Sequence, residues 1–202
     1  MDLDTGSAES DAASEDAPTA DRILDVAEAL IQRRGYNAVS YGDLAEELDM
    51  TTAAIHYHFP AKADLAQALV GRYRRVSAQK RATVREQNEA LRKQLVQYIA
   101  LFSGIVDGGG FCLCGILAAD AETLPEAARQ EVETFFAEQE DWLTEVIGAG
   151  TTGGAGLSGC DSPREVARVL LAAVEGAMLT IPNRDPEVYA DTLHCLIDSI
   201  VT

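Results

Sequence analysis

Residues 39–62 read VSYGDLAEELDMTTAAIHYHFPAK, and this stretch decides the fold of the chain. Its pattern predicts two short helices joined by a tight turn, with Ser40 capping the first helix and Thr51 the second. The second helix would expose hydroxyl and imidazole groups rather than apolar bulk, which suits a helix that lies in the major groove of DNA. Pro60 ends that helix, and a further helix is expected to begin near Ala61.

The apolar residues of this stretch are spaced so that the two helices can pack against each other. Those expected in the internal core of a helix-turn-helix are Leu44, Ala45, Leu48, Met50 and Ile55. Ala45 is small, which lets the two helices approach closely. Asp49 stands at the turn position where glycine is usual, and aspartate tolerates the left-handed backbone conformation better than most residues.

Apolar residues recur at helical spacing along the rest of the chain, without a strand pattern or an internal repeat. We expect one helix from Thr19 to Gly35 and a long one from about Ser77 to Val106, ended by three glycines. Residues 1–17 are small and acidic and are predicted to be a disordered tail. The sequence therefore predicts an all-α fold of about nine helices.

The net charge of −17 is unevenly distributed. Residues 1–20 carry six acidic residues and no basic one, and residues 96–202 carry 17 acidic and four basic residues. The two short helices lie in a nearly neutral region, and six bases follow directly behind it: Arg72, Arg74, Arg75, Lys80, Arg81 and Arg85. This asymmetry favours an N-terminal DNA-binding part.

Acidic residues outnumber basic ones by about two to one, and only three of the 16 bases are lysine. This composition resembles that of proteins from salt-loving microbes, in which a carboxylate-rich surface stays hydrated in concentrated salt. An ordinary acidic cytoplasmic protein is the alternative.

The composition also excludes several classes of protein. No apolar run approaches the roughly 18 residues of a membrane span. The N-terminus lacks the basic region of a secretory signal. Four cysteines, Cys112, Cys114, Cys160 and Cys195, are too few for a disulfide-rich secreted fold. We therefore expect a cytoplasmic protein without a cofactor or a metal site.

With these residues in view, residues 20–75 resemble the DNA-binding domain of the TetR (tetracycline-repressor) family of transcriptional regulators. The most specific piece is IHYHFPAK at residues 55–62, together with the preceding ILD, GY and DLA groups. The resemblance implies a helix-turn-helix three-helix domain at residues 18–66 and a helical effector-binding and dimerisation domain at residues 67–202. The implied function is that of a sequence-specific, ligand-responsive repressor, not an enzyme.

The candidate DNA-binding residues are Tyr41, Gly42, Thr51, Thr52, Ala53, Ala54, His56, Tyr57, His58 and Lys62. By the resemblance, residues 41–42 would touch the DNA backbone or nearby bases, and residues 51–54 would face base edges. Phosphates would be held by Tyr57, His58 and Lys62.

Three of these positions differ from the simplest assignment. By the resemblance, His56 stands where many family members carry tyrosine. His58 has the alternative role of a packing or capping histidine. Lys62 lies at a helix N-terminus, where the helix dipole disfavours a cation, so a bound phosphate explains it better than helix stability does.

The C-terminal half is expected to hold a pocket for a small apolar or amphipathic effector. The candidate lining residues are Phe102, Phe111, Leu113, Phe135, Phe136, Trp142 and Met178, with an ordinary hydrophobic core as the alternative. The last two helices combine small and aliphatic residues, which favours a homodimer through a four-helix interface. Such a dimer would bind a near-palindromic operator on double-stranded DNA.

Cys112 and Cys114 leave one question open. On a helix their side chains would point about 200° apart, so they cannot chelate one metal together. They are either small buried core residues or a redox-sensing pair. Two rival functions also remain: a thiol-dependent enzyme, and a small-molecule or thiol sensor that keeps the same fold without binding DNA.

Overall fold

The computed structural model describes residues 8–150, 158–181 and 185–201, and this part of the chain is helical without a strand. The predicted all-α fold is therefore confirmed. The helices are α1 (Ala8–Arg34), α2 (Tyr41–Leu48), α3 (Thr52–His58), α4 (Lys62–Gln87), α5 (Leu91–Ala100), α6 (Ser103–Asp107), α7 (Leu113–Ala119), α8 (Glu126–Gly150), α9 (Pro163–Thr180) and α10 (Pro186–Ile200). Among them, none is long and apolar enough to cross a membrane.

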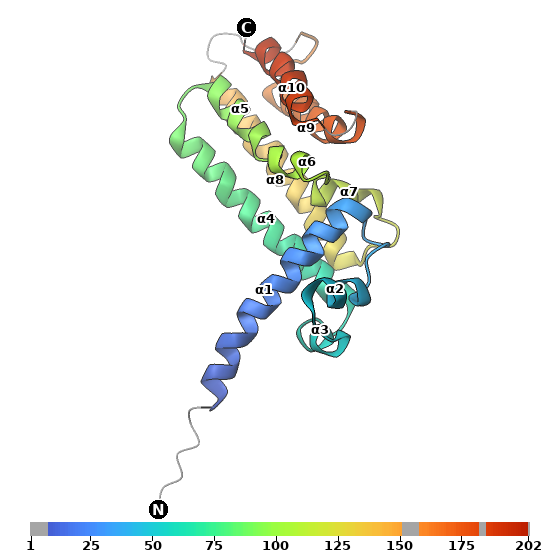
Figure 1. The fold of residues 1–202 in the computed structure, drawn as a ribbon. Helices are drawn as coiled ribbons and strands as arrows, with labels where there is room; N and C mark the ends of the chain where they lie inside the picture. Colours follow the sequence, from blue (N-terminus) through green and yellow to red (C-terminus); the bar gives the residue numbers. More distant parts are fainter. Residues whose placement is uncertain (1–7, 151–157, 182–184, 202) are drawn as a thin grey trace, which may run out of the picture.

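The short helices α2 and α3 lie at one end of the molecule, and α9 and α10 lie at the other (Figure 1). The long helix α4 runs between these ends and packs against α1, α5 and α8. The first turns of α1 project away from the rest of the structure (Figure 1). Because α4 connects the two ends of the molecule, a shift of its axis would also displace α3.

Two predicted helix boundaries were wrong. Helix α4 continues through Ser77 to Gln87, because the intervening residues are mostly good helix formers and none is proline. The chain breaks at Asn88 instead, where the Asn88 side-chain amide donates 2.9 Å to the Val84 carbonyl. The expected long helix from Ser77 to Val106 is accordingly divided among the end of α4, α5 and α6.

The N-terminal boundary also differs from the prediction. Helix α1 begins at Ala8 and not at Thr19, in a stretch that contains several alanines and glutamates, which favour helix. Residues 1–7 of the predicted tail lie outside the described residues. Gly35 ends α1 with φ +83°, a conformation that favours glycine.

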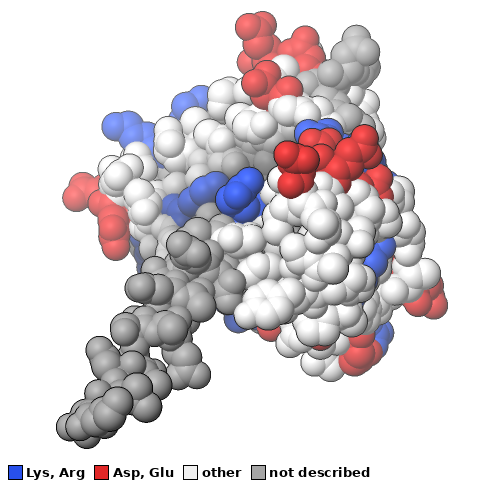
Figure 2. Space-filling model, turned by 60° about the horizontal axis from the view of Figure 1, so that its bottom comes forward, with Lys and Arg blue, Asp and Glu red and all other residues white. Residues whose placement is uncertain are grey.

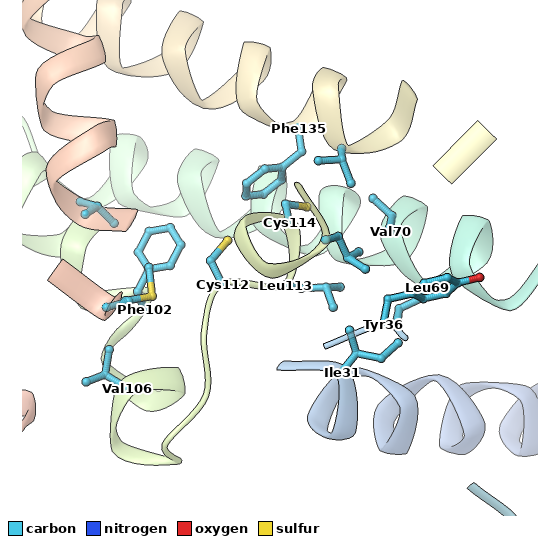
Figure 3. Packing of buried hydrophobic residues seen from close by; sticks show 14 of the residues in the cluster. Ile31, Tyr36, Leu69, Val70, Phe102, Val106, Cys112, Leu113, Cys114 and Phe135 are labelled. Atoms are coloured by element: carbon cyan, nitrogen blue, oxygen red, sulfur yellow. The ribbon is translucent and has the colours of Figure 1, made fainter. Parts of the chain in front are cut away.

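The helix-turn-helix core has the predicted members. Leu44 and Ile55 are fully buried and Leu48 is buried, while the half-buried Ala45 and Met50 pack against the same cluster. The cluster is continuous with the C-terminal part of the chain: Figure 3 shows Ile31 and Tyr36 close to Leu69, with Leu113 beyond them. The two parts therefore share one hydrophobic core.

The local signals around α2 and α3 also agree with the structure. Ser40 and Asp43 form a capping box at the start of α2, and the Thr51 hydroxyl accepts the Ala54 amide at 3.2 Å. Asp49 has φ 52°, and no other non-glycine residue in the described ranges has a positive φ. The turn thus holds a conformation that costs most side chains energy.

This strain predicts the effect of substitutions at Asp49. We expect Asp49→Gly to leave stability unchanged or raise it by up to ~1 kcal/mol, because glycine adopts a positive φ without a Cβ penalty. Asp49→Val should lower it by about 1–2 kcal/mol, because a branched side chain is strained there. Denaturant unfolding followed by circular dichroism measures both. A valine variant as stable as the glycine variant would contradict the argument.

Candidate nucleic-acid interface

Helix α3 has one buried side and one exposed side. Ile55 is fully buried, whereas Thr52 and Ala53 are exposed. Tyr57 is 71% exposed, although it is a large aromatic residue. The exposed side therefore combines small residues, which permit close approach to base edges, with hydroxyl groups that can bond bases or phosphates.

The other candidates near this side have different environments. Thr51 and Gly42 are exposed, and Ala54 is half-buried. His58 is half-buried, with its ring 5.2 Å from that of Tyr57 in an edge-on arrangement. The predicted base-facing run at residues 51–54 is thus at the surface, at the start of α3.

Tyr41 and His56 brace the turn that follows α3. The Tyr41 hydroxyl donates to the Phe59 carbonyl at 2.8 Å, and the Tyr41 and His56 rings meet edge-on at 4.5 Å. His56 Nδ1 lies 3.2 Å from the Pro60 carbonyl oxygen. Burial raises the pKa of Tyr41 to about 12, which keeps its hydroxyl protonated as a donor. This bracing role was not predicted from the sequence.

Lys62 is half-buried and has partners within the chain. Its Nζ donates to the Tyr36 carbonyl at 2.7 Å and lies 4.1 Å from the centre of the Tyr36 ring. Burial lowers the pKa of this ammonium group. The cation at the N-terminus of α4 therefore has a partner within the chain, a carbonyl and an aromatic ring that offset the unfavourable helix dipole.

The backbone amide of Tyr36 has a different partner from its carbonyl: Asp120, which follows α7. Asp120 Oδ2 accepts the Tyr36 amide at 2.9 Å, and Oδ1 accepts the Asn37 side-chain amide at 3.1 Å. Asn37 also donates to the Thr123 hydroxyl at 2.8 Å. The turn between α1 and α2 is thus attached both to α4 and to the segment between α7 and α8.

Most of the bases behind α3 are paired with acids of this chain. Arg72 binds Asp25 at 2.7 Å and Glu28 at 3.2 Å. Arg74 and Arg81 pair with carboxylates of α8, and so does Arg85. These arginines join α4 to α1 and α8, so they support DNA binding less than their sequence positions suggested. Figure 2 brings this end of the molecule forward, and uncharged residues cover most of its described surface.

A cavity of about 240 Å³ lies among α7, α8 and α9. Of the seven predicted pocket residues, Phe111, Phe136 and Met178 line it. Phe102 lines a different cavity, beside α1 and α4. Leu113 and Phe135 are fully buried core residues, and Trp142 stacks on Tyr98 with ring centres 5.4 Å apart.

Glu175 of α9 also lines this cavity and was not predicted from the sequence. Its carboxyl group is largely buried, and that burial raises its pKa to about 7. One signal was available: Glu175 lies four residues after Leu171 and three before Met178, at the edge of the apolar stripe of α9.

The two neighbouring cysteines are poorly placed for thiol chemistry. Cys112 and Cys114 are fully buried, and burial raises the pKa of both thiols well above the usual value. A reactive cysteine requires an accessible thiolate, so these residues fit the core interpretation. Within the described ranges, no group of three or more His, Cys, Asp or Glu residues is arranged to hold a metal ion.

The chain is similar to proteins of known structure. The family described as "Bacterial regulatory proteins, tetR family" matches residues 23–69. A TetR-family transcriptional regulator from Agrobacterium tumefaciens has 32% sequence identity, with a TM-score of 0.86 over 93% of this chain and 100% of that one. A TetR transcriptional regulator from Legionella pneumophila has 29% identity and a TM-score of 0.78, covering 89% and 95%.

A third structure, the regulatory protein TetR from Rhodobacter sphaeroides, shares the fold at 17% identity, with a TM-score of 0.78 over 90% of this chain and 98% of that one. No match was found among curated proteins.

The bonds around Tyr36 predict the effect of removing Asp120. Asp120→Ala leaves the Tyr36 amide without its acceptor, so we expect a loss of about 1–3 kcal/mol in unfolding free energy. Hydrogen exchange at the Tyr36 amide should accelerate as well. Asp107→Ala, at an exposed aspartate, is the control and should change stability by less than ~0.5 kcal/mol. Equal stability of the two variants would contradict this role.

Proposed function

This chain belongs to the TetR family and is a DNA-binding transcriptional regulator, and we propose that it is a homodimeric, ligand-responsive repressor that acts in the cytoplasm. The observation that carries the proposal is the exposed side of α3, with small and hydroxyl-bearing residues over a fully buried Ile55. In this proposal, α3 enters the major groove of a near-palindromic operator.

The proposed contacts follow from the position of each residue. Thr52 and Ala53 would meet base edges, and Thr51 would bond a phosphate or a base while it caps α3. Tyr57 would reach a phosphate oxygen with its hydroxyl. Lys62 would contribute only if its ammonium group were shared between the Tyr36 carbonyl and a phosphate. Sequence readout would therefore depend mainly on uncharged groups.

The dimer would form through α9 and α10. Val169 and Leu179 of α9 and Val188 of α10 are exposed, and Leu179 is 67% exposed. Ala172 is exposed between the first two, and its small side chain permits close helix packing. Two-fold pairing through this face would present two copies of α3 roughly 34–36 Å apart, or a multiple of that spacing.

The coupling between effector and operator would pass through Asp120. The cavity is lined by α7, and Asp120 directly follows α7 and holds the Tyr36 amide. Tyr36 in turn binds Lys62 at the start of α4, next to α3. A ligand that moved α7 would shift these bonds and so favour a dimer whose α3 helices are wrongly spaced for the operator.

One substitution tests the role of α3. Ala53→Glu places a carboxylate where base edges and phosphates are expected, so operator affinity should fall at least about tenfold by repulsion. Fluorescence anisotropy with DNA from upstream of the gene measures this loss. Ala82→Glu, the same change at an exposed alanine of α4, is the matched control and should bind as wild type. Equal binding of both variants would refute the assignment of α3, and absence of specific binding by wild type at every salt concentration would refute the function.

Salt concentration provides a second test, because the acidic composition resembles that of salt-adapted proteins. With few free cations at the interface, we expect a shallow dependence of operator affinity on salt and specific binding that persists in ~1 M KCl. The same titrations at increasing KCl measure it. Complete loss of binding by a few hundred millimolar KCl, in a protein that folds normally at low salt, would contradict the salt-adapted interpretation.

A further inference from the structure

The cavity among α7, α8 and α9 contains a carboxyl group that the chain satisfies only in part. Glu175 Oε1 is buried and accepts no hydrogen bond from a described residue. The Cys112 thiol donates a hydrogen bond to the carboxyl group, and no basic side chain is among the groups that shift its pKa. A buried carboxylate without a counter-charge costs several kcal/mol, by order of magnitude, so its presence needs an explanation.

The carboxyl group of Glu175 lies close to a glycine on the opposite helix. A Cβ atom added at Gly115 of α7 would collide with Glu175 Oε2 and would also touch the Cys112 side chain. Glycine at this position therefore leaves room for the carboxyl group in its present orientation. The carboxyl group lies against α7 and lines the cavity there.

Further polar groups close to Glu175 are also unsatisfied. The hydroxyl groups of Tyr98 and Tyr189 are buried and have no hydrogen-bond partner among the described residues. Burial raises the pKa of both phenols, and the charge of Glu175 raises it further. The chain thus gathers an acid and two hydroxyls in its interior without pairing them.

The remainder of the cavity is apolar and partly aromatic. Phe111, Phe136 and Met178 line it, and Ala118 and Leu179, which are exposed in the single chain, border it. Aromatic faces and a methionine sulfur attract cations and accept apolar groups of varied shape. At about 240 Å³, the cavity has room for about eight water-sized groups.

We propose that this cavity binds a small organic cation, an amine or ammonium compound with a short apolar body, whose positive charge pairs with Glu175. The cation supplies the counter-charge that the chain lacks, and its apolar body lies against Phe111 and Phe136. Its role as the effector rests on the repressor function proposed above, whereas its binding does not.

Because Glu175 titrates near neutral pH, the affinity of the site for a cation should depend on pH. Without ligand, Glu175 is about half protonated near pH 7. A bound cation favours the carboxylate and lowers this pKa, so binding releases a proton below about pH 7. Affinity for the cation should therefore rise about tenfold from about pH 6 to about pH 8 and level off above.

The other titratable groups around Glu175 do not change charge in this range. They are Tyr73 of α4, Tyr98 of α5, Cys112 and Cys114 at the start of α7, and Tyr189 of α10. Burial raises the pKa of each well above its usual value, so all stay neutral between about pH 6 and pH 8.

Calorimetric titration of the full chain with three ligands of equal chain length tests the proposal: hexylamine, hexanol and hexanoate. Hexylamine should bind at least about tenfold more tightly than hexanol at about pH 8, and hexanoate more weakly than either. Glu175→Gln should remove the preference for hexylamine and the proton release, while hexanol binding stays unchanged. Glu133→Gln, at an exposed acid of α8, is the matched control and should behave as wild type.

The outcomes separate this proposal from the proposed function. The pH dependence and the proton release are measured on wild type, so they decide the question even if the Glu175 variant fails to fold. A hexanol affinity equal to that of hexylamine, a preference for hexanoate, or hexylamine binding without pH dependence would overturn the proposal. Operator binding with no hexylamine binding would reject the cation and keep the regulator, and the converse result would keep the cation site and reject the regulator.

Discussion

The geometry of this protein depends on how Tyr36 is held. Its amide donates to Asp120 and its carbonyl accepts the Lys62 ammonium, whose charge also lies over the Tyr36 ring. These bonds fix the turn between α1 and α2 against α4 and against the end of α7. Each bond is worth about 1 kcal/mol by itself. Their importance lies in position, because they join the helix-turn-helix to the helix that lines the cavity.

The arginines behind α3 form ion pairs within the chain, so they are less available to DNA phosphates. The arginines of α4 bind acids of α1 and α8, so their charges are largely neutralised within the fold. The exposed side of α3 consequently carries small and hydroxyl-bearing side chains, and uncharged residues cover most of the described surface at this end of the molecule (Figure 2). A surface of this kind gains little from long-range attraction to phosphates and relies on shape and hydrogen bonds. That property is compatible with a strongly acidic protein that binds DNA.

The cavity contains two features that lower the stability of the folded chain. Burying the carboxyl of Glu175 without a cation lowers stability, and Gly115 gives up the helix propensity that alanine would supply. Both losses occur at one point between α7 and α9. Stability is commonly sacrificed where a ligand is expected to complete the structure. In the site that we propose, the bound cation would offset these losses.

The sequence alone determined the helix-turn-helix, because its signals are local: the Ser40 and Thr51 caps, the left-handed Asp49 and the spacing of Leu44 and Ile55 depend on neighbours a few residues away. It could not determine the partners of Lys62 or of the α4 arginines. Nor could it determine which of the predicted pocket residues line the cavity and which lie in the core. Each of those depends on contacts between helices distant in the chain. Tyr36 meets Asp120, and Gly115 meets Glu175, only after the helices have packed, since sequence spacing does not encode which faces of distant helices come together.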